Sequence, residues 1–170
     1  RLAAGEKIYR AVLDHMKYSK DGTGWGRGDV AHACANGLGN CTDFHSLFIG
    51  MARSKQIPAR FIMGFSIPDA RGSGEVKGYH CWAEFYLPGT GWVPVDAADV
   101  HKIIHDRKLS SVEAKKLPER SYFFGSLEEN RILLGESHGM LTPPQKGGPL
   151  VYFMYPYAEA DGKPLGGDDP

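Results

Sequence analysis

Residues 39–48 read Gly-Asn-Cys-Thr-Asp-Phe-His-Ser-Leu-Phe and open the strongest predicted helix of the chain, which runs to about Ser54. Its apolar residues recur at the spacing of one helix face: they are Phe44, Leu47, Phe48 and Met51. Asn40 suits the N-cap position, and Asp43 lies in the first turn, where the helix dipole favours an acidic side chain. The pattern predicts a core helix that begins at Cys41.

The position of Cys41 at the start of this helix has chemical consequences. The thiolate is the nucleophilic form of cysteine, and the free N–H groups of a helix N-terminus stabilise negative charge. The same groups, beginning with the N–H of Cys41, can stabilise the oxyanion that forms when sulfur attacks a carbonyl. We therefore predict Cys41 as a nucleophile, with Asn40 as a candidate for the oxyanion site or the substrate groove.

Three predicted strands follow the helix, at residues 59–67, 79–86 and 91–96. Short turn segments separate the second and third strands, which favours antiparallel pairing. The sequence thus predicts an α+β fold in which the nucleophile stands at the N-terminus of a central helix packed on an antiparallel sheet.

The register of the last two strands decides whether a base and a carboxylate can meet. His80 lies directly opposite Asp96 when Phe85 pairs with Gly91 across a five-residue loop, and this is the register that we predict. In it, the Asp96 carboxylate orients the imidazole while the ring faces the thiol of Cys41, as in Cys-His-Asp acyl transfer.

The remaining chain is predicted with the same local rules. A first helix is expected over 4–16 and a glycine-rich loop over 21–29, which is a candidate groove wall together with the loop over 68–78. The other predicted elements are helices at 30–35 and 97–105, strands at 122–124, 131–134 and 150–157, and a hairpin turn at Asp161-Gly162.

Length and charge restrict the classes of partner. The chain has 170 residues, the size of one domain, and 20 basic residues balance 20 acidic ones. This neutral balance does not favour nucleic acid, and no apolar run reaches the length of a membrane span, so no membrane insertion is predicted. The first residue is Arg1, which leaves open a signal segment before it, and the late hairpin turn leaves open a continuation after it.

Several blocks of sequence occur together in one order. They are Gly39-Asn-Cys-Thr-Asp-Phe-His-Ser-Leu-Phe48, Ala52-Arg53, Ile57-Pro-Ala-Arg60, Gly78-Tyr-His-Cys-Trp-Ala-Glu-Phe-Tyr86 and Gly91-Trp-Val-Pro-Val-Asp96. In this combination the chain resembles the core of the transglutaminase-like superfamily. The resemblance implies a papain-like fold with core motifs over 39–99, a family-specific extension over 100–170 and a flexible tail from about residue 161, all within one domain over 1–170.

The resemblance also implies a chemistry. Cys41 would be the nucleophile, His80 the general base and acid, and Asp96 the orienting carboxylate, acting on a peptide or protein amide through a thioester. Hydrolysis is favoured over cross-linking to an amine acceptor, because a small domain has little with which to keep water from a thioester. The alternative is a non-catalytic peptide-binding or scaffolding domain that retains the fold.

Four further side chains are candidates for supporting positions. Trp25 and Trp82 are candidates for the groove or the oxyanion site, and Trp82 shares the strand face of His80. His45 is predicted as a second-shell group, because it lies one helical turn after Cys41 but has no orienting carboxylate in the sequence. Arg131 is expected to hold a structural ion pair.

The remaining cysteines and histidines receive structural interpretations. Cys34 and Cys81 are expected as buried thiols or as one disulfide, which would indicate an oxidising compartment; a secreted or periplasmic location is favoured. His101 and His105 stand at helical spacing but lack a third and fourth ligand, so neither a metal nor a cofactor is predicted.

Overall fold

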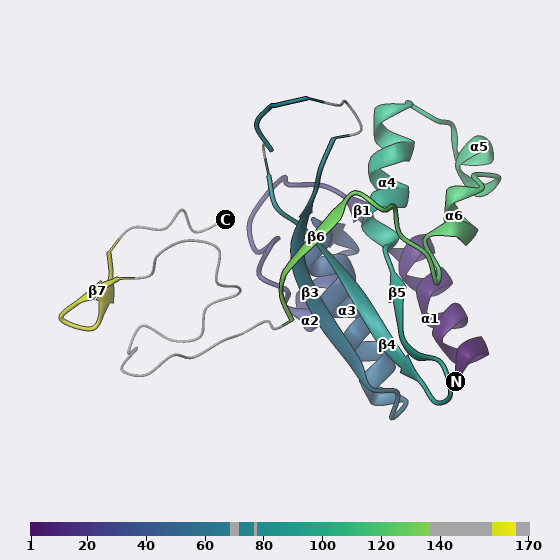
Figure 1. The fold of residues 1–170 in the computed structure, drawn as a ribbon, viewed down its shortest axis with the longest axis horizontal. Coiled ribbons are helices and arrows are strands. Elements are labelled where there is room, and N and C mark those ends of the chain that lie inside the picture. The colour runs from purple at the N-terminus through teal and green to yellow at the C-terminus, as the bar shows by residue number, and fades with distance from the viewer. Residues whose placement is uncertain (69–71, 77, 137–157, 166–170) are drawn as a thin grey trace.

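A four-stranded antiparallel sheet in the order β5-β4-β3-β6 forms the centre of the protein (Figure 1). Its strands are β3 (Ala59–Ser66), β4 (His80–Leu87), β5 (Gly91–Val95) and β6 (Arg131–Gly135). This computed structural model describes residues 1–68, 72–76, 78–136 and 158–165. The three strands predicted between residues 59 and 96 are therefore confirmed, and β6 adds the edge strand beside β3.

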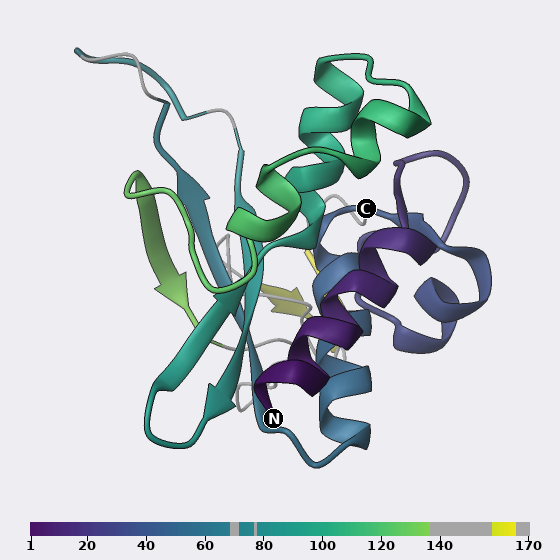
Figure 2. The same ribbon diagram turned by 90° about the vertical axis from the view of Figure 1, so that its right-hand side faces the viewer.

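Helices cover one face of this sheet (Figure 2). They are α1 (Leu2–His15), α2 (Val30–Asn36) and α3 (Cys41–Ser54). Helix α3 packs directly on β3 and β4, and the fully buried rings of Phe48 and Phe85 meet between helix and sheet. The predicted α+β class is confirmed, with a central helix that begins at Cys41.

The chain after β5 forms a separate group of helices beside the end of the sheet (Figure 2). These are α4 (Ala97–Asp106), α5 (Ser111–Lys115) and α6 (Glu119–Tyr122). Two short parallel strands, β1 (Lys17–Tyr18) and β2 (Leu38–Gly39), join the end of α1 to the segment before α3. A hairpin of β7 (Glu159–Ala160) and β8 (Lys163–Pro164) forms at the predicted turn.

The predicted register of β4 and β5 is wrong by two residues. Leu87 pairs with Gly91, rather than Phe85, and the loop between the strands has three residues instead of five. The N–H of Thr90 donates to the carbonyl of Leu87, and Gly89 adopts the positive φ of 83° that this tight turn requires. Because a shift of two residues keeps every side chain on its predicted face, Asp96 still lies on the face of His80, diagonally rather than directly opposite.

The prediction of a strand at 122–124 is also wrong. Tyr122 ends α6, and the N–H groups of Tyr122 and Phe123 donate to the carbonyls of Pro118 and Glu119 in a helical turn. Only Phe124 joins the sheet, through one bridge to Val95. The strand predicted at 150–157 lies outside the described residues. None of the helices in the described ranges is long and apolar enough to cross a membrane.

Candidate active site

The start of α3 is held by reciprocal hydrogen bonds. Oδ1 of Asn40 accepts from the N–H of Thr42 at 2.9 Å, and Oδ2 of Asp43 accepts from the N–H of Asn40 at 2.9 Å. These contacts form a capping box and confirm the predicted N-cap. They fix the helix end that carries Cys41. The side-chain oxygen of Asn40 is occupied by its hydrogen bond from Thr42 within the cap.

Asp43 also holds the glycine-rich loop at 21–29 against this helix end. Its carboxylate is fully buried and accepts from the N–H of Gly26 at 2.6 Å and from the N–H of Gly28 at 3.2 Å. A Cβ on Gly39 would lie 2.3 Å from Oδ2 of Asp43, so only glycine fits beside it. Sequence reasoning assigned Asp43 only a favourable dipole interaction and missed this second role.

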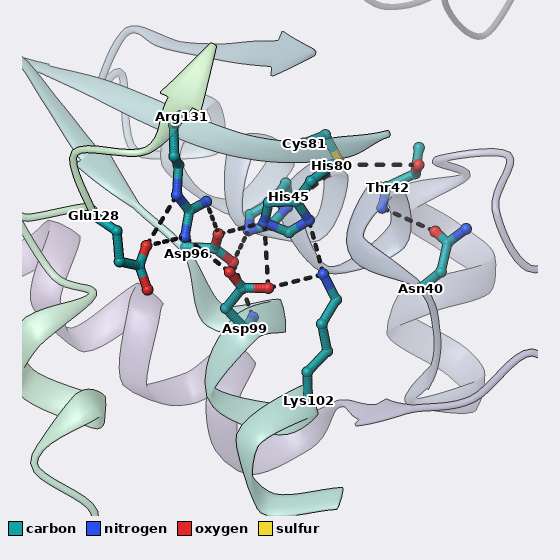
Figure 3. Close-up of polar contacts among 10 residues, drawn as sticks. All are labelled: Asn40, Thr42, His45, His80, Cys81, Asp96, Asp99, Lys102, Glu128 and Arg131. Carbon is teal, nitrogen blue, oxygen red and sulfur yellow. Dashed lines mark hydrogen bonds and ion pairs between the residues drawn. The ribbon is translucent and has the colours of Figure 1, made fainter. Parts of the chain in front are cut away.

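His80 and Asp96 meet at the junction of β4, β5 and α4 (Figure 3). Nε2 of His80 lies 2.6 Å from Oδ2 of Asp96, and both side chains are buried. Asp96 caps α4, because its Oδ1 accepts from the N–H of Asp99 at 3.0 Å. The carboxylate is therefore fixed by the helix that it begins, and it orients the imidazole through Nε2.

Cys41 is half-buried and lies beside this pair. A hydrogen bond with Cys81 and a hydrogen bond with His80 lower the pKa of the Cys41 thiol well below its ordinary value, against the opposing effect of burial, and the charge of Lys102 acts in the same direction. The structure thus brings together Cys41, His80 and Asp96, the three residues predicted from the sequence.

Three charged residues that sequence reasoning did not assign to the site surround the His80–Asp96 pair. Arg131 donates through Nη1 to Oδ2 of Asp96 at 2.5 Å and through Nη2 to Oδ2 of Asp99 at 2.8 Å. Lys102 lies 2.8 Å from Oδ1 of Asp99 and 2.9 Å from Nδ1 of His80. The ion pair expected of Arg131 is present, and its partner is the carboxylate of the site.

The charges of this network set the protonation of His80. Burial alone would lower the pKa of His80, but the charges of Asp96 and Asp99 outweigh it and raise the pKa to about 10. Burial likewise raises the pKa of Asp96, and the opposing charge of His80 holds it well below its ordinary value. An imidazolium between two carboxylates is therefore the favoured state at neutral pH.

The predicted supporting residues lie in different relations to the site. Trp82 is buried on the face of His80, with ring centroids 6.5 Å apart, and packs under the guanidinium of Arg131. Trp25 is half-buried in its loop, and the ammonium of Lys20 lies 5.8 Å from its ring. Their assignment to a groove or an oxyanion site stays a prediction.

His45 is fully buried beneath the site and does have a carboxylate nearby. Its Nε2 lies 3.4 Å from Oδ1 of Asp96 without hydrogen-bond geometry, and its Nδ1 lies 3.7 Å from Sγ of Cys81. The ring thus points to Cys81. Sequence reasoning missed the carboxylate because it comes from a strand end far along the chain.

The structural interpretation is confirmed for Cys81, which is a buried thiol, and is wrong for Cys34. Cys34 is exposed on α2, whereas Cys81 is buried between β4 and α3, and both are free thiols. The expected disulfide is absent because the two residues belong to different environments: helix α2 turns Cys34 to solvent, and the strand alternation turns Cys81 toward α3.

One group of described side chains has the spacing of metal ligands. Donor atoms of His80, Asp96 and Asp99 lie within 4.8 Å of one another. However, Arg131 bonds to both carboxylates, and Lys102 bonds to Asp99. These cations already neutralise the oxygens that a metal would need, so the donor set is that of an ion-pair network.

A cleft of about 530 Å³ opens beside the network. Its lining is Tyr18, residues 19–21, Lys102, His105 and Asp106. Burial and the charge of Cys41 raise the pKa of Tyr18 to about 12. The cleft offers a polar entrance to the side of the site occupied by Lys102.

Comparison with known proteins assigns the family. The sequence profile of the transglutaminase-like superfamily matches residues 1–97, more than half of the chain. The chain therefore belongs to the transglutaminase-like superfamily, and the resemblance carried by its motifs is confirmed.

Two relatives share substantial sequence with the chain. An uncharacterized protein of Haemophilus influenzae is 35% identical over 189 residues, which cover 99% of this chain and 51% of the relative. The uncharacterized protein YebA of Bacillus subtilis is 32% identical over 65 residues, which cover 33% of this chain and 9% of that protein. The chain thus spans about half or less of the length of these relatives.

Solved structures show partial similarity. A candidate cysteine protease from Cytophaga hutchinsonii matches 57% of this chain and 30% of its own, with 26% identity and a TM-score of 0.42. The periplasmic domain of TgpA from Pseudomonas aeruginosa matches 66% of this chain and 46% of its own, with 19% identity and a TM-score of 0.41.

Proposed function

We propose that the chain is a cysteine-dependent acyl-transfer domain that attacks amide bonds of peptides or proteins and forms a thioester on Cys41. The observation that carries this proposal is the hydrogen bond between His80 and Asp96 beside Cys41, whose thiol pKa is lowered at a helix N-terminus. Thiol-based acyl transfer requires a thiol with a lowered pKa, an imidazole beside the thiol and a carboxylate that orients the imidazole.

The proposed reaction assigns one role to each group. The Cys41 thiolate attacks the amide carbonyl, and the oxyanion that forms is stabilised by N–H groups at the start of α3. Protonated His80 then gives its proton to the leaving amine, the C–N bond breaks, and the acyl group stays on sulfur as a thioester. A second nucleophile gives its proton to His80, attacks the thioester and releases the thiolate.

We propose water as the preferred second nucleophile. Cys41 is only half-buried, and a polar cleft is lined by Lys102, which lies 2.9 Å from Nδ1 of His80. Water therefore has access to a thioester at this position, whereas efficient amine transfer needs an acceptor site that excludes it. The natural substrate would be a peptide or protein, with an amine as the competing acceptor.

The proposal is tested with a glutamine-containing peptide and an excess of primary amine, followed by intact mass. Peptide cleavage or release of ammonia with water added supports hydrolysis, and incorporation of the amine with loss of ammonia supports cross-linking chemistry. Cys41→Ala is expected to abolish either reaction. If the wild-type protein shows neither reaction over a peptide library and does not label with acylating probes, the non-catalytic peptide-binding function replaces the proposal.

Two histidine variants test which ring acts on Cys41. His80→Gln is expected to reduce labelling by a thiol-directed acylating probe strongly, because it removes an imidazole whose charge lowers the pKa of the Cys41 thiol. His45→Gln is expected to retain most labelling, because the His45 ring points to Cys81. An inactive His45 variant together with an active His80 variant would contradict the assignment.

A further inference from the structure

A second thiol lies beneath the site and has no role in the proposed acyl transfer. Cys81 follows His80 in β4 and is fully buried on the strand face that packs against α3 (Figure 3). Its Sγ lies 3.9 Å from Oγ1 of Thr42 and 3.7 Å from Nδ1 of His45, both on the first turns of α3. Cys81 therefore points at the helix end that carries Cys41.

The two thiols are close neighbours. Thr42, which Cys81 contacts at 3.9 Å, is the residue directly after Cys41, and each of the two thiols shifts the pKa of the other. Both side chains belong to the core of the fold, where α3 packs on β4. A disulfide needs two Cβ atoms about 4 Å apart, and neighbouring thiols can approach that distance through side-chain rotations.

From this juxtaposition we propose that Cys81 is a resolving thiol, which converts a peroxide-oxidised Cys41 into a reversible Cys41–Cys81 disulfide. The inference rests on the proposed function, because it needs Cys41 to be a reactive thiolate. It adds a modification of the same site and a role for Cys81 that the transfer reaction does not need.

The chemistry requires hydrogen peroxide as the oxidant and balances in two steps. The Cys41 thiolate attacks one peroxide oxygen, an S–O bond forms, the O–O bond breaks, and the departing hydroxide takes a proton to become water. Sγ of Cys81 then attacks the sulfenic sulfur of Cys41, an S–S bond forms, the S–O bond breaks, and a second water leaves. Two thiols have lost two electrons and two protons, and the peroxide has been reduced to two waters.

His45 supplies the acceptor for the proton of Cys81. Its Nδ1 lies 3.7 Å from Sγ of Cys81, and its Nε2 lies 3.4 Å from the Asp96 carboxylate. Nε2 is buried and has no hydrogen-bond partner among the described residues. The site thus holds two thiol–imidazole pairs that share Asp96: Cys41 with His80, and Cys81 with His45.

The different surroundings of the two sulfurs set the order of events. Cys41 is half-buried and its pKa is lowered, whereas burial and the neighbouring Cys41 raise the pKa of Cys81. A peroxide therefore reacts first with Cys41, because the thiolate is the reacting form and the sulfur is accessible. Cys81 remains a protected thiol until sulfenic acid forms beside it.

The test uses a Cys34→Ser protein, which removes the exposed thiol and disulfides between molecules. The protein is treated with a molar excess of hydrogen peroxide, denatured, alkylated and measured by intact mass and non-reducing peptide mapping. The expected product has lost two hydrogens, takes up no alkylating reagent, contains linked Cys41 and Cys81 peptides, and regains labelling at Cys41 after dithiothreitol. In Cys34→Ser/Cys81→Ala, Cys41 is expected to gain two or three oxygens and to resist dithiothreitol.

Cys34→Ser/Cys81→Ser repeats the comparison with a side chain closer in volume, in case the alanine variant folds poorly. Equal over-oxidation of Cys41 with and without Cys81 would overturn the inference, as would a failure to form the Cys41–Cys81 linkage. Alkylation of the reduced protein near pH 6 separates the two proposals. If Cys41 is alkylated rapidly but forms no disulfide after peroxide treatment, only the proposed role of Cys81 is overturned. If Cys41 is alkylated slowly, its proposed role as the nucleophile is overturned as well.

Discussion

Nζ of Lys102 lies 2.9 Å from Nδ1 of His80, on the ring nitrogen that Asp96 does not hold. An ammonium can only donate, so this contact requires a neutral imidazole that carries its proton on Nε2. The charges of Asp96 and Asp99 raise the pKa of His80 to about 10, so protonation of Nδ1 ends this hydrogen bond at neutral pH and leaves Lys102 paired with Asp99. A proton and the Lys102 ammonium therefore compete for the same nitrogen.

Lys102→Met should make Cys41 a weaker nucleophile at low pH. The charge of Lys102 helps to lower the pKa of the thiol, so its removal raises that pKa, and one unit corresponds to about tenfold less thiolate below the pKa. Alkylation rates of Cys41 should fall at pH 6 and remain unchanged at pH 9.5. Lys20→Met, in the same cleft, is the matched control and should leave both rates unchanged. Equal rates for Lys102→Met and wild type at pH 6 would refute the electrostatic role.

Arg131→Met should destabilise the fold strongly. The change leaves the fully buried Asp96 carboxylate without the guanidinium that neutralises it, and removal of one member of a buried ion pair costs about 3–5 kcal/mol. Urea unfolding measures the difference. Arg10→Met is the control, because its ion pair with Glu6 is exposed and contributes less than about 1 kcal/mol. Similar losses of unfolding free energy in the two variants would show that Arg131 does not stabilise the fold by neutralising Asp96.

Asp43→Asn should loosen the loop at 21–29. The carboxylate accepts from three backbone N–H groups, and an amide with one acceptor oxygen cannot replace it. We expect a loss of about 1–3 kcal/mol in stability and faster tryptic cleavage after Arg27. Asp21→Asn, an exposed change in the same loop, should leave cleavage after Arg27 at its original rate. Unchanged cleavage in Asp43→Asn would mean that other contacts hold the loop.

The free energy of unfolding should fall as pH rises from about 6.5 to about 10. The pKa of His80 is raised from 6.5 to about 10 in the folded protein, so the folded state binds the proton more tightly. The stabilisation that this proton provides is complete at pH values below the pKa of His80 in the unfolded chain. It is lost as the pH rises through the pKa of His80 in the folded protein. Denaturation of Cys41→Ala, which removes the opposing effect of the thiol, should show this slope. The double variant Cys41→Ala/His80→Gln should show a smaller slope, and identical slopes would contradict the raised pKa.

The parts of the site that follow local rules could be predicted from the sequence. The capping box at Asn40 and the helix that begins at Cys41 depend on residues within one turn, and those residues were readable. The face shared by His80 and Asp96 also followed from strand alternation. Their exact pairing did not, because it depends on the turn at Gly89, where a three-residue loop and a five-residue loop keep the same faces.

The missed residues come from elements whose positions depend on the assembled fold. Arg131 reaches Asp96 from β6, 35 residues later in the chain, and Lys102 reaches His80 from α4. The pair of Cys81 and His45 requires α3 to pack on β4 in one particular register. No local pattern marks such contacts, although a buried Asp at a helix N-cap is itself a sign that a cation must lie nearby.

The central claim is that Cys81 and His80 together lower the pKa of the Cys41 thiol, and the pH dependence of its alkylation tests the part of His80 most directly. Iodoacetamide rates at Cys41 are measured in the Cys34→Ser protein and in Cys34→Ser/His80→Gln. We expect the alkylation rate of the first protein to reach half of its maximum at a pH well below the ordinary thiol pKa of 9.0. In the second protein this pH should lie clearly closer to 9.0. Two profiles that coincide near the ordinary value would contradict it.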